Sequence, residues 1–200
     1  MVRSGELEFE FEDEMEHELE YERSGMVRGA PRIQIVYSRA LPGSREFEYE
    51  DEGELFDPAP PPRGAALLTR FAVASAAFTR DHRVILPRLA AALFRVWPKK
   101  PTFCLYVSVV GHEDEVGDPA RFGEWGRKRA KAVAEELKKQ MNALWARLPA
   151  ASRPNGQVIF EVSTAGPRKP IRSNVTRQGQ ALNRRVEVTA RRPDVCRDVA

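Results

Sequence analysis

The sequence is poor in cysteine, and Cys104 and Cys196 are the only two among its 200 residues. Two cysteines cannot build the framework of several disulfides that stabilises small secreted domains. Cys104 stands in the apolar stretch TFCLYVSVV, where a thiol usually packs as a small buried side chain. We therefore expect unpaired cysteines and a reducing compartment.

Long apolar runs are absent as well. A helix that crosses a bilayer needs about 20 consecutive apolar residues, and no stretch of the sequence approaches that length. We therefore expect no transmembrane segment. The N-terminal stretch MVRSGELEFEFEDEMEHELEYE has neither an apolar core nor a small-residue cleavage site, so a secretory signal is not predicted.

Positive charge is scarce in residues 1–57, which hold 17 Asp and Glu against 6 Arg, a net charge of −11. The remaining residues hold 12 acids against 26 Lys and Arg, a net charge of +14. A positive net charge is typical of domains that bind nucleic acid. The cations are scattered, however, and no nucleic-acid-binding motif is present, so we expect no nucleic-acid partner.

Residues 1–57 form an acidic leader in which glutamate alternates with apolar residues, as in ELEFEFEDEMEHELEYE. This composition is typical of disordered segments, because like charges along one side of a strand repel. The other interpretation is a strand that pairs with a basic protein partner, which neutralises its charge. The apolar piece RIQIVYS predicts a short strand near 32–37. The proline-rich segment 58–64 predicts a stiff linker, which precedes a domain over 65–192 and a tail over 193–200.

Apolar periodicity and proline positions predict the elements of this domain. They are a strand within 67–79, a helix over 80–97, a strand over 102–110, a helix that begins at Asp118–Pro119, and strands over 156–166 and 183–191. Pro87 is expected to bend or delay the first helix, whose apolar stripe comprises Val84, Leu89, Leu93 and Val96. The residues between the last two strands are expected to form a loop. The order β-α-β-α-β-β predicts an α/β fold of the α+β sandwich type, with two helices packed on one face of a mixed sheet.

The segment GHEDEVGDPARFGEWGRKRAKAV, residues 111–133, lies where a central strand ends and a helix begins. Open α/β sheets tend to hold ligands at such positions. Asp114 in the loop and Arg129 about three turns into the helix can bind a zwitterion, because the carboxylate takes an ammonium and the guanidinium a carboxylate. The alternative is a salt bridge between these two residues within the domain.

A metal site is another interpretation of this loop, because His112 is followed by three acidic residues. Adjacent residues on an extended loop point in alternate directions, and the spacing HExxH is absent. We therefore expect no metal and no other cofactor. His112 is expected to form hydrogen bonds at the corner between strand and loop.

Together with GQALNRRVEV at 179–188, this segment resembles the OmpA-like C-terminal domain family. The family pattern is roughly GHTDxxGxxxxNxxLSxxRAxxV, followed by a closing G-x-x-x-NRRVE strand. The matching residues are Gly111, His112, Asp114, Gly117, Arg129, Ala130, Val133, Gly179, Asn183, Arg184, Arg185, Val186 and Glu187. The departures are Glu113 in place of Thr, Phe122 in place of Asn, and Trp125-Gly126 in place of Leu-Ser. The resemblance extends over about residues 65–192.

The resemblance implies a domain that is not an enzyme and binds peptidoglycan through its diaminopimelate side chain. It implies Asp114 and Arg129 as the binding pair, with Asn183, Arg184 and Arg185 as further binding residues. It also implies a place in the cell envelope or periplasm, where such a module anchors an envelope-associated assembly. Because no signal is readable, a cytoplasmic location or non-classical export stays open.

The sequence is also consistent with a second function. The chain can be a structural or interaction protein that keeps the fold, has an eroded ligand site and docks through its acidic leader. Leaders of this acidic and aromatic kind weakly resemble those of proteins near phage-tail-like contractile injection systems.

Overall fold

The computed structural model describes residues 31–37, 64–191 and 194–196, and the rest of the acidic leader and the linker lie outside the described residues. The regular elements are β1 (Ile33–Tyr37), β2 (Ala66–Leu68), α1 (Arg80–Arg95), β3 (Phe103–His112), α2 (Glu124–Ala146), β4 (Gln157–Gly166), α3 (Arg177–Asn183), β5 (Val186–Ala190) and β6 (Asp194–Val195). Single 3₁₀ turns occupy Pro119–Arg121 and Ala150–Ser152.

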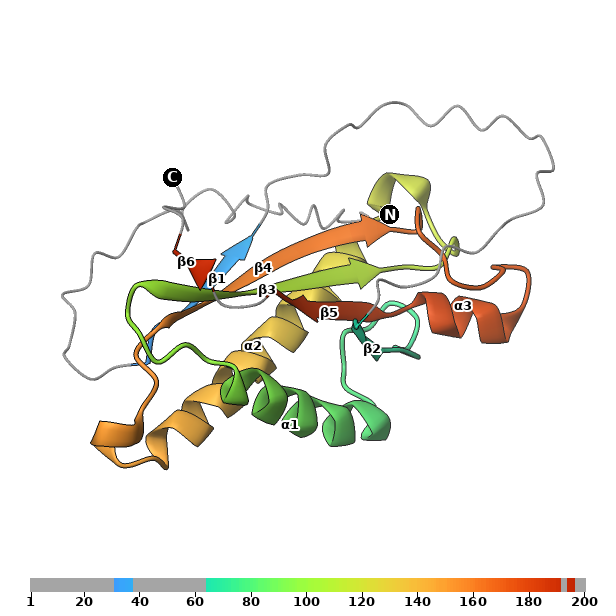
Figure 1. Ribbon diagram of the computed structural model, residues 1–200. Helices are drawn as coiled ribbons and strands as arrows, with labels where there is room; N and C mark the ends of the chain where they lie inside the picture. The colour runs from blue at the N-terminus through green and yellow to red at the C-terminus, as the bar shows by residue number, and fades with distance from the viewer. Residues whose placement is uncertain (1–30, 38–63, 192–193, 197–200) are drawn as a thin grey trace, which may run out of the picture. The chain divides into compact units, whose positions relative to one another are not determined.

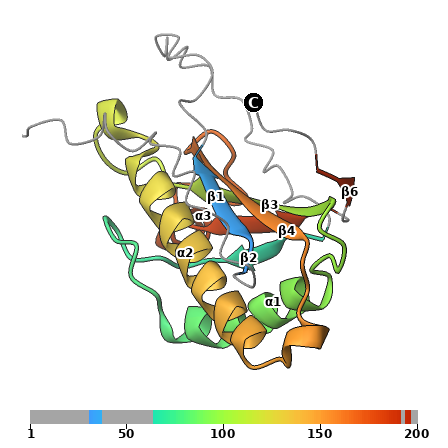
Figure 2. The ribbon, with the colours of Figure 1, turned by 90° about the vertical axis from the view of Figure 1, so that its left-hand side faces the viewer.

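The strands form one mixed sheet in the order β1-β4-β3-β5-β2, and β6 pairs with the beginning of β3. The pairs β1–β4 and β3–β4 are parallel, whereas β2–β5 and β3–β5 are antiparallel. Both long helices cover the same face of the sheet (Figures 1 and 2). The predicted α+β sandwich is therefore confirmed, and so is the short strand near 32–37, which is β1.

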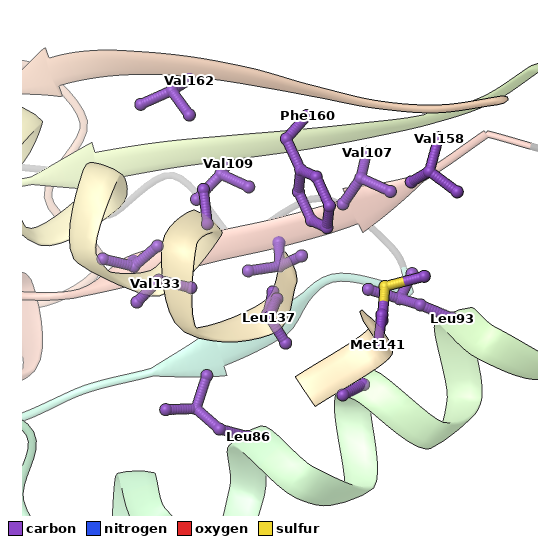
Figure 3. Packing of buried hydrophobic residues seen from close by; sticks show 14 of the residues in the cluster. Leu86, Leu93, Val107, Val109, Val133, Leu137, Met141, Val158, Phe160 and Val162 are labelled. Carbon is purple, nitrogen blue, oxygen red and sulfur yellow. The ribbon is translucent and has the colours of Figure 1, made fainter. Parts of the chain in front are cut away.

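The core lies between this face of the sheet and the two helices, as Figure 3 shows. Alternate residues of β3 and β4, among them Val107 and Phe160, point toward the helices because successive side chains of a strand face opposite sides. On α2, Val133, Leu137 and Met141 recur at helical spacing and are fully buried.

The N-terminal part of α2 lies unusually close to β3. A Cβ atom added at Gly111 would lie 1.8 Å from the carbonyl oxygen of Gly126, and one added at Gly126 would lie 2.5 Å from Thr164 Oγ1. Neither position accepts a side chain without movement of the backbone or of Thr164. The glycine at 126, a departure from the family pattern, thus lets the helix approach the strand that precedes the candidate site.

Three element predictions were wrong in detail. The strand expected within 67–79 is confined to β2, because the chain then turns away through Arg70 and Ala74, both of which have positive φ. The helix start expected at Asp118–Pro119 is a single 3₁₀ turn capped by Asp118, and α2 begins only after Gly123, whose φ is +97°. The expected loop between the last two strands contains the short helix α3, capped by Thr176.

The apolar stripe predicted for the first helix was also wrong in part. Val84 and Val96 are 51% and 47% exposed, and the buried residues of α1 are His82, Leu86, Ala90 and Leu93. His82 occupies an inward position because it completes the N-terminal cap. Its backbone N–H donates to Thr79 Oγ1, and its Nδ1 accepts from the backbone N–H of Thr79. The helix starts at Arg80 and continues through Pro87.

The expectation of unpaired cysteines was wrong, because Cys104 and Cys196 form a disulfide. Cys196 lies beside β3 because β6 continues the antiparallel pairing beyond β5, and its backbone N–H donates to the carbonyl of Thr102. The two positions are 92 residues apart in sequence, and only the folded sheet brings them together. A disulfide persists in an oxidising compartment, so the expectation of a reducing one loses its basis.

Candidate functional site

The candidate site lies at the end of the sheet at which β2, β3 and β4 all terminate. We call this line of strand ends the edge of the sheet. These three strands run in the same direction, since β3 is parallel to β4 and both β2 and β3 are antiparallel to β5. The loops 69–79, 113–123 and 167–176 therefore leave from the same edge. The chain enters β5 at this edge as well, directly after α3.

Asp114, in the loop after β3, forms a buried ion pair with Arg184. Arg184 Nη1 donates to Asp114 Oδ2, and the two side chains are 11% and 6% exposed. Arg184 Nε also donates to the carbonyl of Phe71 at 2.8 Å, which links the ion pair to the loop after β2. Asp114 thus lies where the sequence predicts, but its partner comes from the end of α3.

Arg129 makes no salt bridge with Asp114. Arg129 is 1% exposed, and its guanidinium donates to three backbone carbonyls, those of Ser75, His112 and Ala72, at 2.8, 3.2 and 3.1 Å. Burial lowers the pKa of Arg129 to about 10, although the nearby carboxylates of Glu113 and Asp114 oppose this shift. Arg129 therefore stays charged at neutral pH and holds the loop 69–79 against the end of β3.

Glu113 caps the beginning of α2. Its two carboxylate oxygens accept from the backbone N–H groups of Gly123 at 2.9 Å and Gly126 at 2.5 Å. A helix start carries free N–H groups and partial positive charge, so a carboxylate is stabilising there. Gly123 has no side-chain oxygen and cannot cap the helix itself. Glu113 supplies this function across ten residues, a role that the sequence analysis did not assign to it.

His112, Arg185 and Glu187 form a second buried cluster, on the face of the sheet opposite the helices. Arg185 donates to Glu187 through Nε and Nη2 at 2.8 and 2.6 Å, and Nη2 also donates to the carbonyl of Lys169. His112 Nε2 lies 3.5 Å from Glu187 Oε1. Burial lowers the pKa of both His112 and Arg185, while Glu187 opposes each shift. At the corner between strand and loop, the backbone N–H of His112 donates to Arg185.

Asn183 is fully buried and organises the loop before α3. Its Oδ1 accepts from the backbone N–H groups of Ile171 and Arg172 at 2.9 and 3.1 Å. Its Nδ2 donates to the carbonyl of Arg172 and to Asn174 Oδ1 at 2.7 and 2.8 Å. Asn183 thus fixes the loop that leads into Arg184.

The structure brings Asp114, Arg184 and Arg129 together at one edge, and it places Asn183 and Arg185 around them without contact to Asp114. Arg184 and Arg185 point to different neighbours because adjacent residues at the start of a strand alternate in direction. In the part of the chain that the structure describes, no group of three or more His, Cys, Asp or Glu residues is arranged to hold a metal ion. The acids of the loop diverge, since Glu113 faces α2, Asp114 faces Arg184 and Glu115 is exposed.

The tryptophans serve the core and its rim. Trp97 and Trp145 are buried, and their indole N–H groups donate to the carbonyls of Gly156 and Pro154. Trp125 is partly exposed and lies under the ammonium of Lys128. Neither α1, α2 nor α3 is long and apolar enough to span a membrane.

Solved structures similar to the chain include the peptidoglycan-associated lipoprotein from Burkholderia pseudomallei, with 20% identity, a TM-score of 0.46, and coverage of 62% of this chain and 88% of that one. The C-terminal domain of MotB from Helicobacter pylori gives 22% identity, a TM-score of 0.45, and coverage of 63% and 84%. The cell wall anchor of the T6SS from Pseudomonas aeruginosa has 22% identity and a TM-score of 0.39, with coverage of 66% of this chain and 81% of that one. No protein-family model and no curated protein matches the chain.

Proposed function

We propose that the edge formed by the loops after β2, β3 and β4 binds peptidoglycan noncovalently, through the zwitterionic end of its diaminopimelate side chain. The observation that carries the proposal is the ion pair between Asp114 and Arg184, which lies within the motif shared with OmpA-like domains. A free amino acid end carries an ammonium and a carboxylate on one carbon. Its ammonium can replace Arg184 as the partner of Asp114, and its carboxylate can replace Asp114 as the partner of Arg184.

Binding then proceeds by an exchange of partners. The ligand ammonium takes Asp114, and Arg184 turns its forked guanidinium to the ligand carboxylate while Nε keeps its hydrogen bond to Phe71. Arg129 adds positive potential from beneath, and two of its five N–H donors are not engaged by the three carbonyls. Asn183 and Arg185 position the loops around the pair. No nucleophile is activated in this scheme, and the proposed module is not an enzyme.

We place the proposed module in the cell envelope, where it anchors an assembly to the wall. The disulfide between Cys104 and Cys196 supports an oxidising compartment for this role. The acidic leader and its basic protein partner remain a prediction, because the leader lies outside the described residues apart from β1 and the two residues before it.

Isothermal titration calorimetry with muropeptides tests the proposal. The full chain is titrated with a diaminopimelate muropeptide and with one that carries lysine in its place, which lacks the second carboxylate. We expect binding of the first only, and Asp114→Asn and Arg184→Gln each to cost about 1.5–3 kcal/mol of binding free energy, more than tenfold in affinity.

Arg147→Gln is the matched control, because Arg147 is exposed at the far end of α2. It should leave the affinity unchanged. No binding by the parent chain, or equal binding of both muropeptides, would remove the proposal. The chain would then be an interaction module that retains the fold.

A further inference from the structure

The outward face of α1 carries a row of arginines. The helix packs against α2 and β2 through His82, Leu86, Ala90 and Leu93. At about 100° per residue, Arg80, Val84, Arg88 and Arg95 fall within about 80° of arc on the opposite side. All four are exposed. We call these four residues the outer face of α1.

The arginines of this face make no ion pair within the described residues, and exposed Asp81 at its margin is the one acid of α1. Among residues 31–37, 64–191 and 194–196, no carboxylate makes a salt bridge with Arg80, Arg88 or Arg95. On α2, by contrast, two of the exposed cations, Lys128 and Lys139, pair with glutamates of their own helix. The face therefore presents positive potential to solvent, which favours association with an anionic partner.

We propose that the outer face of α1 binds an acidic segment of a partner protein, in which carboxylates alternate with apolar side chains. At a rise of about 1.5 Å per residue, Arg80 and Arg88 are about 12 Å apart along the helix, and Arg88 and Arg95 about 10.5 Å. In an extended chain, residues four apart on the same side are separated by about 13 Å. Alternating carboxylates therefore meet successive guanidinium groups.

The composition of the face favours a protein segment over a membrane surface. Helices that bind membranes insert large apolar side chains such as Trp, Phe and Leu, whereas the apolar residue of this face is Val84, which lies between Arg80 and Arg88. Arginine also favours carboxylates, because its planar fork donates two parallel hydrogen bonds. Residues 6–22 of the chain have this alternating composition, with 10 Asp and Glu and no Lys or Arg, so a peptide of this sequence is a suitable probe for such a partner segment.

Fluorescence anisotropy with a labelled synthetic peptide of the sequence 6–22 tests the proposal. The full chain is compared with the variant Arg80→Gln/Arg88→Gln/Arg95→Gln at low salt. Because three charged contacts are lost, we expect affinity to fall on the order of tenfold or more, and parent binding to weaken at high salt. The control is Arg127→Gln/Lys139→Gln/Arg147→Gln, on α2 and at its C-terminal cap, which removes the same charge and should keep affinity within about twofold.

Two further comparisons distinguish specific arginine–carboxylate contacts from attraction by net charge alone. Arg→Lys at the same three positions should recover only part of the affinity, and a peptide with the same composition but its acids in one block should bind more weakly. Absent binding, equal loss in both triple variants, or equal binding of the two peptides would overturn the proposal. Binding of the parent to phosphatidylglycerol vesicles in place of the peptide would overturn it in favour of a membrane surface. Circular dichroism checks that each variant is folded.

Discussion

Asp114 is paired with Arg184, a residue 70 positions away in sequence, and not with Arg129, which lies in the helix that follows its loop. The two arginines therefore have different tasks. Arg184 neutralises the carboxylate at the edge of the sheet, where the proposed ligand would compete for it. Arg129 is enclosed by backbone carbonyls and holds the adjoining loop.

Replacement of Arg129 should reduce stability more than replacement of an exposed arginine of the same helix. Arg129→Ala leaves carbonyls of Ser75, His112 and Ala72 without a donor and leaves a cavity beside the core. Unpaired buried polar groups and a cavity together should cost about 2–4 kcal/mol in the free energy of unfolding. Urea denaturation followed by circular dichroism measures this cost. Arg127→Ala on the exposed side of α2 is the control, and an equal effect of the two changes would contradict the assignment.

Glu113 should be a stabilising cap and not part of the ligand site. Glu113→Ala removes both acceptors of the N–H groups at Gly123 and Gly126. We expect a loss of about 1–3 kcal/mol in the free energy of unfolding. Glu115→Ala, the same change at an exposed neighbour, should stay within about 0.5 kcal/mol. Thermal unfolding of the two variants compares them directly, and similar melting temperatures would exclude the capping role.

The fold was predictable because its elements carry strong local signals. Buried β-branched residues mark β3, and the helical spacing of Val133, Leu137 and Met141 marks α2. The pairing of the elements at the site has no such signal. The partner of Asp114 depends on how the end of α3 meets the loop after β3, and this contact arises only when the sheet has formed.

The errors have a common physical cause. Val84 is apolar and at helical spacing, yet it faces solvent, because the inward position is taken by His82, which has hydrogen-bond partners there. Glu113 departs from the family pattern, but its function depends on two backbone N–H groups ten and thirteen residues away. Pairing of Cys104 with Cys196 likewise depends on β6, which adds to the edge of β3. Each of these features depends on contacts between segments and is not determined by residue type alone.

The disulfide should make a large contribution to stability. It closes a separation of 92 residues, and the loss of such a cross-link typically costs about 2–5 kcal/mol, mainly through the unfolded chain. Cys104→Ser/Cys196→Ser should therefore unfold at lower urea concentration than the oxidised parent, and under reducing conditions the two proteins should unfold alike. Mass spectrometry after iodoacetamide treatment reports the thiols. Labelling of two thiols in the folded parent under non-reducing conditions would contradict the structure.

Stability should also fall as the pH is lowered through the range in which histidine titrates, and His82 is a main cause. His82 Nε2 donates to the carbonyl of Thr69 at 2.6 Å, while Nδ1 accepts from the backbone N–H of Thr79 at 3.2 Å. This arrangement requires the neutral ring. Burial lowers the pKa of His82 below its usual value of 6.5, although Thr69 and Asp81 oppose the shift.

The sign of the pH effect follows from the number of bound protons. Below pH 6.5 the unfolded chain takes up a proton on His82 before the folded chain does, so protonation favours unfolding. The contribution of His82 to stability is therefore present above pH 6.5 and is lost as the pH falls toward the lower pKa that His82 has in the folded chain. The pKa of His112 is lowered as well, and this residue adds to the effect in the same direction.

His82→Gln should separate the two histidines. Glutamine cannot titrate, so the variant should be less stable at pH 7.5 because its cap is weakened, yet it should lose less stability between pH 7.5 and 5.5 than the parent. Urea midpoints at several pH values measure both effects. His17 lies in the leader, outside the described residues, and His17→Gln serves as the control, with an unchanged pH profile expected. A parent whose midpoint is constant over this range, or a variant with the same slope as the parent, would show that His82 is not neutral and buried in the folded chain.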